Sequence, residues 1–316
     1  MSRSYLPSLI LLAVLWGSSY PFMREGVKEL GPAALIDARL WLAAPLLLAY
    51  AARRAGGVRP LWAGIRRLWV PCLLLGVLNV GAPYAAIAWA EKHIDAGTAS
   101  IANAAVPIFV VLLAIRFEPD EQVGHWRHLG LGIGLGGVAL LVGIDPGGGW
   151  IGVAGALAVV AASISYAACG LYAKAALRGG AGGGGSEGLP PAAGAVLAAG
   201  SVAVGAVALL PLAAFDLPAE APGATTLGCI VGLALLGTVG AQIVYFHMLA
   251  LHGAGRVTMV TFLIPVVSIA IGALWLGEAV TWVKLGGLAL ILGGVALGSG
   301  MWEPRRAGGR ARMVGR

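Results

Sequence analysis

The chain has 316 residues, of which 59% are hydrophobic and only 11% are charged, and its mean hydropathy is +0.88. Soluble domains carry roughly 25% charged residues, so this composition excludes a soluble enzyme or binding domain and indicates an integral membrane protein. The net charge of +7 would suggest an acidic partner if the basic residues shared one surface, but they are concentrated in loops and tails. We therefore expect the lipid bilayer and a small solute as partners, and no nucleic acid.

Apolar runs long enough to cross a hydrocarbon core of about 30 Å recur along the whole chain. The first run follows Arg3 as in a signal peptide, but no A-x-A cleavage site follows it, so we expect it to remain in the protein. The Gly-rich segment 178–189 is predicted to be a flexible linker, and 303–316 a basic tail. The predicted fold is all-α, with ten transmembrane helices near residues 5–23, 32–51, 69–90, 96–116, 128–144, 150–174, 190–214, 226–250, 255–276 and 282–301.

The basic residues predict the orientation in the membrane, because cytoplasmic loops carry an excess of Lys and Arg. If the N-terminus is cytoplasmic, sixteen of the twenty-one Lys and Arg residues fall on the cytoplasmic side. The five on the opposite side are Arg24, Lys28, Arg39, Lys92 and Lys284. We therefore predict that both termini face the cytoplasm.

The two halves of the chain resemble each other, as an internal duplication would require. AGTASIANAAVP at 96–107 aligns with AGRVTMVTFLIP at 254–265, and LGIGLGGVAL in the fifth span aligns with LALILGGVAL in the tenth. SSY in the first span matches SISY in the sixth. Chance matching of small apolar residues is the alternative, but the matches fall in the same order in both halves. We predict two five-span repeats, 1–145 and 146–302; because five is odd, the second is inverted in the membrane, as in many secondary transporters.

Several motifs together resemble the EamA branch of the drug/metabolite transporter superfamily. They are LWGSSYPF in the first span, DARLWLAA with Arg39 in the second, a proline within the fourth and ninth spans, LWLGEAVTWVKLGGLALILGGVAL at 274–297 and its weaker echo RFEPDEQVGHWRHLGLGIGLGGVAL at 116–140. Within that superfamily the chain is similar to YddG-type amino-acid exporters. The resemblance implies a multi-pass exporter of the bacterial inner membrane, with a central cavity lined by the first, third, fourth, sixth, eighth and ninth spans. It leaves the substrate open.

Polar residues and a proline share one face of the fourth span and, by the repeat, of the ninth. The residues at this i, i+3, i+7 spacing are Ser100, Asn103 and Pro107, and Thr258, Thr261 and Pro265. Each proline removes the hydrogen bond to the carbonyl four residues earlier, so Pro107 and Pro265 are predicted to kink their helices beside Asn103 and Thr261. We predict that the polar side chains face a solute. The alternatives are a hydrogen bond from Asn103 to a neighbouring helix, and hydroxyls that bond back to their own helix.

Other polar and aromatic side chains within the spans are candidates for the same cavity, because a polar group in lipid must be paired or hydrated. Tyr and Trp offer an apolar wall with a polar tip and can hold an ammonium group, although both also form belts at the membrane interface. Asn79 and Tyr84 do not share a face of a regular α-helix, so at most one is expected to point inward, and Gln242 is favoured over Thr238. The further predicted substrate-binding residues are Trp16, Ser19, Tyr20, Asn79, Tyr84, Ser165, Tyr166, Gln242 and Tyr245.

No Asp or Glu lies in the middle of the ten predicted spans. Proton coupling usually needs an intramembrane carboxylate, so we predict facilitated, uniport-like export of amino acids or small zwitterions by alternating access, through a cavity without charge. His247, deep in the eighth span, is expected to be a packing residue. A proton-coupled multidrug or metabolite exporter is the alternative, and a channel or an integral-membrane enzyme would be a different class.

Against an enzyme, the sequence contains no HExxH motif, no DxxD-type carboxylate pair and no P-loop. No catalytic residue, cofactor or metal site is predicted, and Cys72, Cys169 and Cys229 are expected to pack within the spans. Small residues in the fifth and tenth spans either dimerise the protein or let helices of one bundle pack closely. We expect the latter, and hence a monomer; the residues are Gly132, Gly136, Gly286, Gly287, Gly293 and Gly294.

Overall fold

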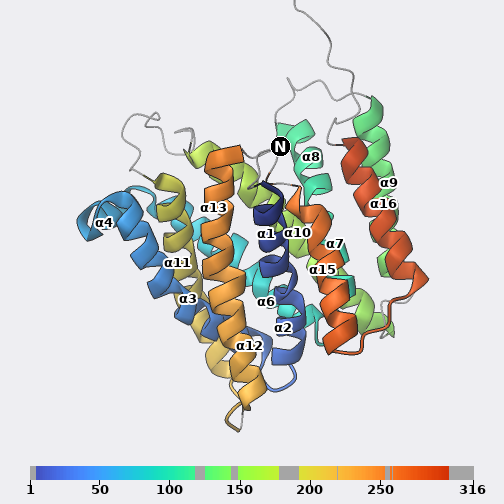
Figure 1. Cartoon of the computed structure of the whole chain (residues 1–316), viewed down its shortest axis with the longest axis horizontal. Helices are drawn as coiled ribbons and strands as arrows, with labels where there is room; N and C mark the ends of the chain where they lie inside the picture. Colours follow the sequence, from blue (N-terminus) through green and yellow to red (C-terminus); the bar gives the residue numbers. More distant parts are fainter. Residues whose placement is uncertain are drawn as a thin grey trace, which may run out of the picture.

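The computed structural model describes residues 5–117, 125–143, 149–177, 192–218, 220–252, 257 and 259–298. Every regular element in these ranges is helical, and the helices occupy the positions of the ten predicted spans (Figure 1). Seven of the spans are long and apolar enough to cross a membrane as they stand, and the fifth, ninth and tenth are shorter apolar helices. The predicted all-α, ten-span fold is confirmed. The linker 178–189 and the tail 303–316 lie outside the described residues.

Four spans consist of more than one helix. The first is α1 (Tyr5–Gly17) with α2 (Ser19–Gly26), and the third is α5 (Trp69–Leu75), the π-helix η1 (Gly76–Gly81) and α6 (Ala82–Ala90). The fourth is α7 (Ala96–Asn103) with α8 (Val106–Phe117), and the eighth is α12 (Ala224–Ala234), the π-helix η2 (Leu235–Gly240) and α13 (Ala241–His252). All four belong to the set predicted to surround a cavity.

Within the described residues, each of the remaining spans is represented by one long helix. They are α3 (Pro32–Ala55), α9 (His125–Gly143), α10 (Gly149–Leu177), α11 (Ala193–Phe215), α15 (Val260–Trp275) and α16 (Trp282–Gly298). Pro32 begins α3 at a position where its missing N–H is not needed, and Gly56 ends the helix with a left-handed φ of 87°. A further short helix, α4 (Val58–Arg67), follows this turn and leaves the side chain of Trp62 exposed, as suits a helix at the membrane interface.

The contacts between spans repeat in the two halves of the chain. α1 packs on α15 as α10 packs on α7 and α8, and α3 packs on α12 as α11 packs on α5 and η1. Equivalent spans also pair with each other, α3 with α11 at one end of the molecule and α9 with α16 at the other (Figure 1). Because five spans separate their starts, α1 and α10 enter the bundle from opposite faces. The halves therefore pack as an inverted pair.

The two π-helices occupy equivalent places in the halves, with Gly81 of η1 matching Gly240 of η2 in the repeat. A π-helix closes its hydrogen bonds over five residues instead of four, and such segments are frequent at functional sites. This pair of π-helices was not predicted, because the amino-acid composition of an apolar π-helical turn does not differ from that of a regular α-helical turn. It adds a further symmetric feature at mid-span.

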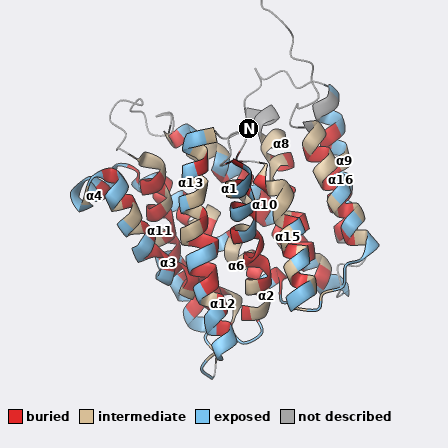
Figure 2. Ribbon diagram, viewed as in Figure 1, coloured by how far each residue is buried: buried red, intermediate tan, exposed pale blue. Residues whose placement is uncertain are grey.

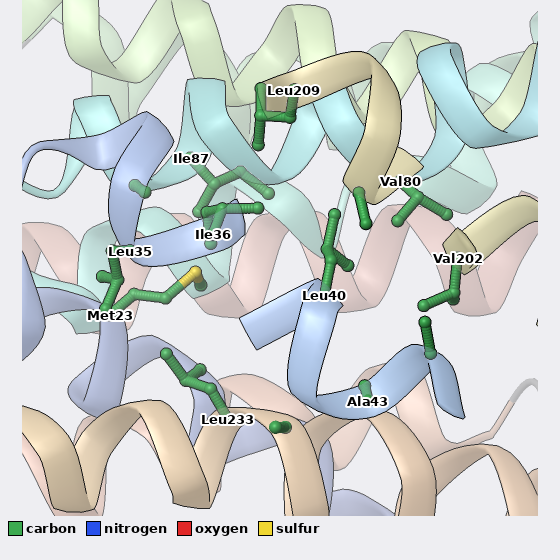
Figure 3. Packing of buried hydrophobic residues seen from close by; sticks show 14 of the residues in the cluster. Met23, Leu35, Ile36, Leu40, Ala43, Val80, Ile87, Val202, Leu209 and Leu233 are labelled. Carbon is green, nitrogen blue, oxygen red and sulfur yellow. The ribbon is translucent and has the colours of Figure 1, made fainter. Parts of the chain in front are cut away.

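Buried apolar side chains fill the inward faces of the helices, and exposed ones cover the outward faces (Figure 2). In the largest cluster Met23, Leu35, Ile36, Leu40 and Leu233 come together between α2, α3 and α12 (Figure 3). The exposed apolar surface matches a protein surrounded by lipid rather than water. The three cysteines are buried and unpaired with one another, in agreement with a packing role.

Some of the small residues of α9 and α16 pack between helices as predicted, and others do not. A methyl group added at Gly294 of α16 would lie 2.5 Å from the backbone nitrogen of Gly134 in α9, so these two backbones touch. A methyl group added at Gly132, Gly136 or Gly293 would meet no atom within 4 Å. The GxxxG pair of α9 therefore lies on the face turned away from α16.

Candidate substrate cavity

A cavity of about 300 Å³ lies between the two halves near the middle of the spans. Residues of α1, α2, α3, α10 and α13, and of the third, fourth and ninth spans, form its wall. The predicted substrate-binding residues on this wall are Trp16, Ser19, Tyr20, Asn79, Tyr84, Ser100, Asn103, Tyr166, Gln242 and Thr261. The second span, with Arg39, was not among the spans expected to line it.

A larger hollow of about 530 Å³ adjoins this cavity and shares Asn79, Tyr84 and Gln242 with it. Its wall includes the predicted residue Tyr245 and continues to Arg54 and Leu177, near the ends of α3 and α10. The cavity is therefore reached from the face where these two helices end. α1 begins at Tyr5 on the same face (Figure 1).

A chain of three polar side chains crosses the cavity wall from α2 to α10. The Nδ2 of Asn103 donates a hydrogen bond of 2.8 Å to the Tyr20 hydroxyl, and the Ser163 hydroxyl lies 3.1 Å from Asn103 Oδ1. Ser163 also bonds to its own helix at Val159 O, 2.9 Å away. Asn103 thus lines the cavity and bonds neighbouring helices at once, so both interpretations of this residue apply. Ser163 was missed, although it belongs to the repeated SISY motif.

The two prolines act differently. The fourth span stops at Asn103, turns through residues 104–105 and starts again at Val106, so Pro107 lies in the first turn of a new helix, where its missing N–H leaves no gap. The span is broken rather than kinked. Pro265 lies inside α15, as predicted, and its partner Thr261 is on the cavity wall. The fourth and ninth spans therefore resemble each other in sequence, but their helices differ in local geometry around the proline.

Asn79 and Tyr84 both line the cavity, which contradicts the expectation that at most one of them points inward. Asn79 belongs to η1, and residues five apart share a face in a π-helix. The extra residue in this turn aligns the two side chains. Regular α-helical geometry, on which the prediction was based, does not hold here.

Arg39 places a charge on the cavity wall, so the prediction of an uncharged cavity is wrong. Its side chain is buried, with only 2% of the residue surface exposed. The Nε donates a hydrogen bond of 2.8 Å to Thr238 Oγ1 and Nη2 one of 3.3 Å to Gly237 O, both in η2. The guanidinium carbon also lies 4.3 Å from the centre of the Tyr84 ring, a cation–π contact.

Aromatic rings form a further part of the walls of the cavity and of the adjoining hollow. Trp16 and Tyr245 lie with their ring centres 5.7 Å apart, and Tyr84 and Tyr166 lie 6.3 Å apart in an edge-to-face arrangement. Of the other predicted residues, Tyr245 lines the adjoining larger hollow, and Ser165 lines neither hollow and donates a hydrogen bond to Leu78 O instead. Thr258 lies outside the described residues. The aromatic pairs are thus inside the bundle and not in an interfacial belt.

The opposite face of the bundle is held together by carboxylates that cap helices of the other half. Glu29, in the turn before α3, accepts a hydrogen bond of 2.7 Å from Gly223 N at the start of α12. Asp216, at the end of α11, accepts one of 2.8 Å from Ala33 N at the start of α3. The bond from Gly223, followed by one from Thr226, lowers the pKa of the Glu29 carboxyl. Each half thus supplies a carboxylate that caps a helix of the other half.

A third cap on this face involves Glu278, from the GE motif after the ninth span. Its carboxylate accepts hydrogen bonds from Ala96 N (2.8 Å) and Gly97 N (3.2 Å) at the start of α7. Next to it Lys284 lies 3.0 Å from Asp95 in an ion pair. A carboxylate at a helix N-terminus is stabilised by the free N–H groups and the helix dipole. Glu278 therefore ties the second half to the cavity helix of the first.

Glu91 is fully buried behind these contacts, just beyond the end of α6. Neither of its carboxyl oxygens has a hydrogen-bond partner among the described residues, while its backbone oxygen accepts a bond from Arg24. Burial raises the pKa of this carboxyl well above its usual range; Glu278 adds to the effect and Arg24 opposes it. The face that carries Glu91 is thus closed.

Comparison with known proteins agrees with this architecture. The model of the EamA-like transporter family matches residues 4–143 and 153–299, one match for each half. A solved crystal structure superimposes with a TM-score of 0.62 over 94% of this chain and 96% of that one, at 20% identity, and supports the fold alone.

Curated relatives extend over nearly the whole chain. A protein of Streptantibioticus cattleyicolor named as a probable terminal-alkyne amino-acid exporter is 31% identical, covering 92% of this chain and 91% of its own. The uncharacterised inner membrane transporter YedA of Escherichia coli is 29% identical (94% and 92% covered), and a probable amino-acid metabolite efflux pump of Salmonella typhimurium is 24% identical over the full length of both. The chain is a multi-pass membrane transporter, and it belongs to the EamA-like transporter family.

Proposed function

We propose that this transporter exports amino acids or closely related small zwitterions across the bacterial inner membrane by alternating access. The observation that carries the proposal is the cavity between the inverted halves, whose largely apolar and aromatic wall carries a few polar side chains and which adjoins a hollow that continues toward the face where α3 and α10 end. Its volume of about 300 Å³ is at the lower end of ligand sites, so it suits a small metabolite. The names of two relatives, which refer to amino acids, support the same class.

The direction of transport follows from the distribution of charge. Arg53, Arg54, Arg59, Arg66 and Arg67 lie at or near the face toward which the larger hollow continues. Because basic residues accumulate on the cytoplasmic side, this face and the N-terminus are assigned to the cytoplasm. The conformation described is then open to the inside and closed to the outside. A solute would enter the cavity from the cytoplasm and leave after the caps on the outer face separate.

Transport is proposed to be facilitated. No Asp or Glu is among the residues that line either hollow within the described part of the chain, so the cavity itself holds no carboxyl group that could exchange a proton for the solute. Proton-coupled export is the second candidate, because the carboxyl group of Glu91 is buried beside the outer contacts with no hydrogen-bond partner among the described residues. Accumulation of solute against its gradient under a pH gradient alone would favour this second candidate.

The test is transport by the purified protein in liposomes. Labelled alanine, leucine, phenylalanine and propargylglycine, a terminal-alkyne amino acid, are offered beside a cationic drug. We expect saturable uptake of at least one amino acid and none of the drug. Asn103→Ala should lower the rate about fivefold, because it removes a polar group worth about 1 kcal/mol from the wall. Ser165→Ala, off the wall, is the matched control and should transport normally.

A further inference from the structure

Arg39 carries a positive charge into the interior of the membrane domain, and no described carboxylate lies within ion-pairing distance of it. Burying an unpaired charge is costly, and intramembrane charges are usually paired or functional. Thr238, Gly237 and the Tyr84 ring contact the guanidinium, but all three are neutral. The side chain is therefore held in place without an ion pair among the described residues.

The hydrogen bonds of Arg39 leave part of the guanidinium available. A guanidinium has five N–H donors, and the two bonds to η2 use two of them. The side chain is on the cavity wall together with Asn79, Tyr84 and Gln242, so the remaining donors adjoin the cavity. The planar fork of Arg matches a carboxylate with two parallel hydrogen bonds.

We propose that Arg39 binds the carboxylate of the transported solute and thereby restricts transport to molecules that carry an anionic group. This inference rests on the proposed function and specifies its chemistry. The ammonium group of a zwitterion is then directed away from Arg39, toward the neutral oxygens and aromatic rings of Tyr20, Asn103 and Tyr166 on the same wall. A cation without a carboxylate would meet an unbalanced positive charge, which disfavours its entry.

The contacts of Arg39 also join the two halves of the protein. Its bonds connect α3 of the first half with η2 of the second, across the surface along which the halves must move. A solute carboxylate that takes up the free donors adds negative charge at this junction. Removing Arg39 would therefore affect both solute affinity and coupling between the halves, and an experiment has to separate the two effects.

The experiment measures competition with labelled L-propargylglycine in proteoliposomes of the wild-type protein. N-acetyl-propargylglycine keeps the carboxylate and lacks the cation, whereas propargylglycinamide keeps the cation and lacks the carboxylate. We expect the N-acetyl compound to compete and the amide to compete at least tenfold more weakly. Equal competition by both compounds, or stronger competition by the amide, overturns the proposal.

Variants of Arg39 test whether this residue is responsible for the difference between the two competitors. Arg39→Gln should raise the KM for propargylglycine roughly 10- to 100-fold, the size expected for a hydrogen bond to a charged group, and abolish the difference between the two competitors. Arg39→Lys should restore part of that difference, because it keeps the charge and loses the fork. A purely structural role would lower the rate and leave the competitor ratio unchanged, and this result also overturns the proposal. If Arg39→Gln does not fold, Thr238→Val, which releases Nε while keeping the charge, should reduce the ratio partially.

A binding measurement distinguishes failure of the Arg39 proposal from failure of the proposed function. If no amino acid is transported, binding of the N-acetyl anion is measured by thermal stabilisation of the purified protein. Binding that is lost in Arg39→Gln then supports the anion site while the amino-acid proposal fails. Absence of binding by any carboxylate compound overturns both.

Discussion

Replacing Glu278 by Gln should shift the transporter toward its outward-open conformation. The carboxylate accepts two backbone hydrogen bonds, from Ala96 and Gly97, that join the second half to the first on the closed face. Gln keeps one acceptor oxygen and loses the charge, so we expect a loss of about 2 kcal/mol from one charge-assisted bond and the helix-dipole interaction. If the contact exists only in the closed-outside conformation, this loss changes the ratio of conformations about 30-fold.

The assay is the distribution of distances between spin labels at Lys92 and Val280, which are exposed on this face in the first and second halves. The Glu278→Gln variant should populate a longer distance that is minor in the wild-type protein. Glu25→Gln is the control, because the ion pair of Glu25 among the described residues is with Lys28, one turn away in the same half. An unchanged distribution in Glu278→Gln, or an equal shift in Glu25→Gln, would refute the assignment of Glu278 as a contact that holds the outer face closed.

Three further predictions concern stability in detergent. Gly294→Ala should destabilise the protein by about 1–3 kcal/mol, because the new methyl group would lie 2.5 Å from the backbone of Gly134, whereas Gly293→Ala should be neutral or slightly stabilising; equal thermal stabilities would contradict this. The raised pKa of Glu91 means that the folded state retains a proton that the unfolded chain releases near pH 4.3. The free energy of unfolding should therefore fall as pH rises above about that value, and this fall should be absent in Glu91→Gln. The lowered pKa of Glu29 has the opposite sign: its contribution is present above about pH 4.3 and should be lost as pH falls through the folded-state pKa, with Glu29→Gln lacking this acid-dependent loss.

The pH predictions can be read from the differences between each variant and the wild-type protein over one series of unfolding curves. Parallel curves for Glu91→Gln and the wild-type protein would show that Glu91 is ionised or hydrated in the folded state. A wild-type curve that matches Glu29→Gln at all pH values would show that the cap on α12 adds nothing to stability.

Much of the site was predictable because it depends on helix periodicity and on the repeat. Trp16, Ser19 and Tyr20 share a helix face from their spacing alone, and the alignment of the two halves identified Asn103 and Thr261 as partners. All five lie on the cavity wall. What periodicity could not predict was a change in the periodicity itself: the π-turn of η1 brings Asn79 and Tyr84 to one face, and the break after Asn103 turns a predicted kink into two helices.

The sequence by itself determined the ten spans, the duplication and the family, because hydropathy, charge in loops and motif order are properties of consecutive residues. Only the tertiary structure decided which charged residues enter the interior. Arg39 could be counted as a loop-side charge until its contacts with η2 were seen, and Glu278 as an interfacial acid until it capped α7. Both positions depend on contacts between residues almost 200 positions apart in the chain, which local sequence patterns do not encode.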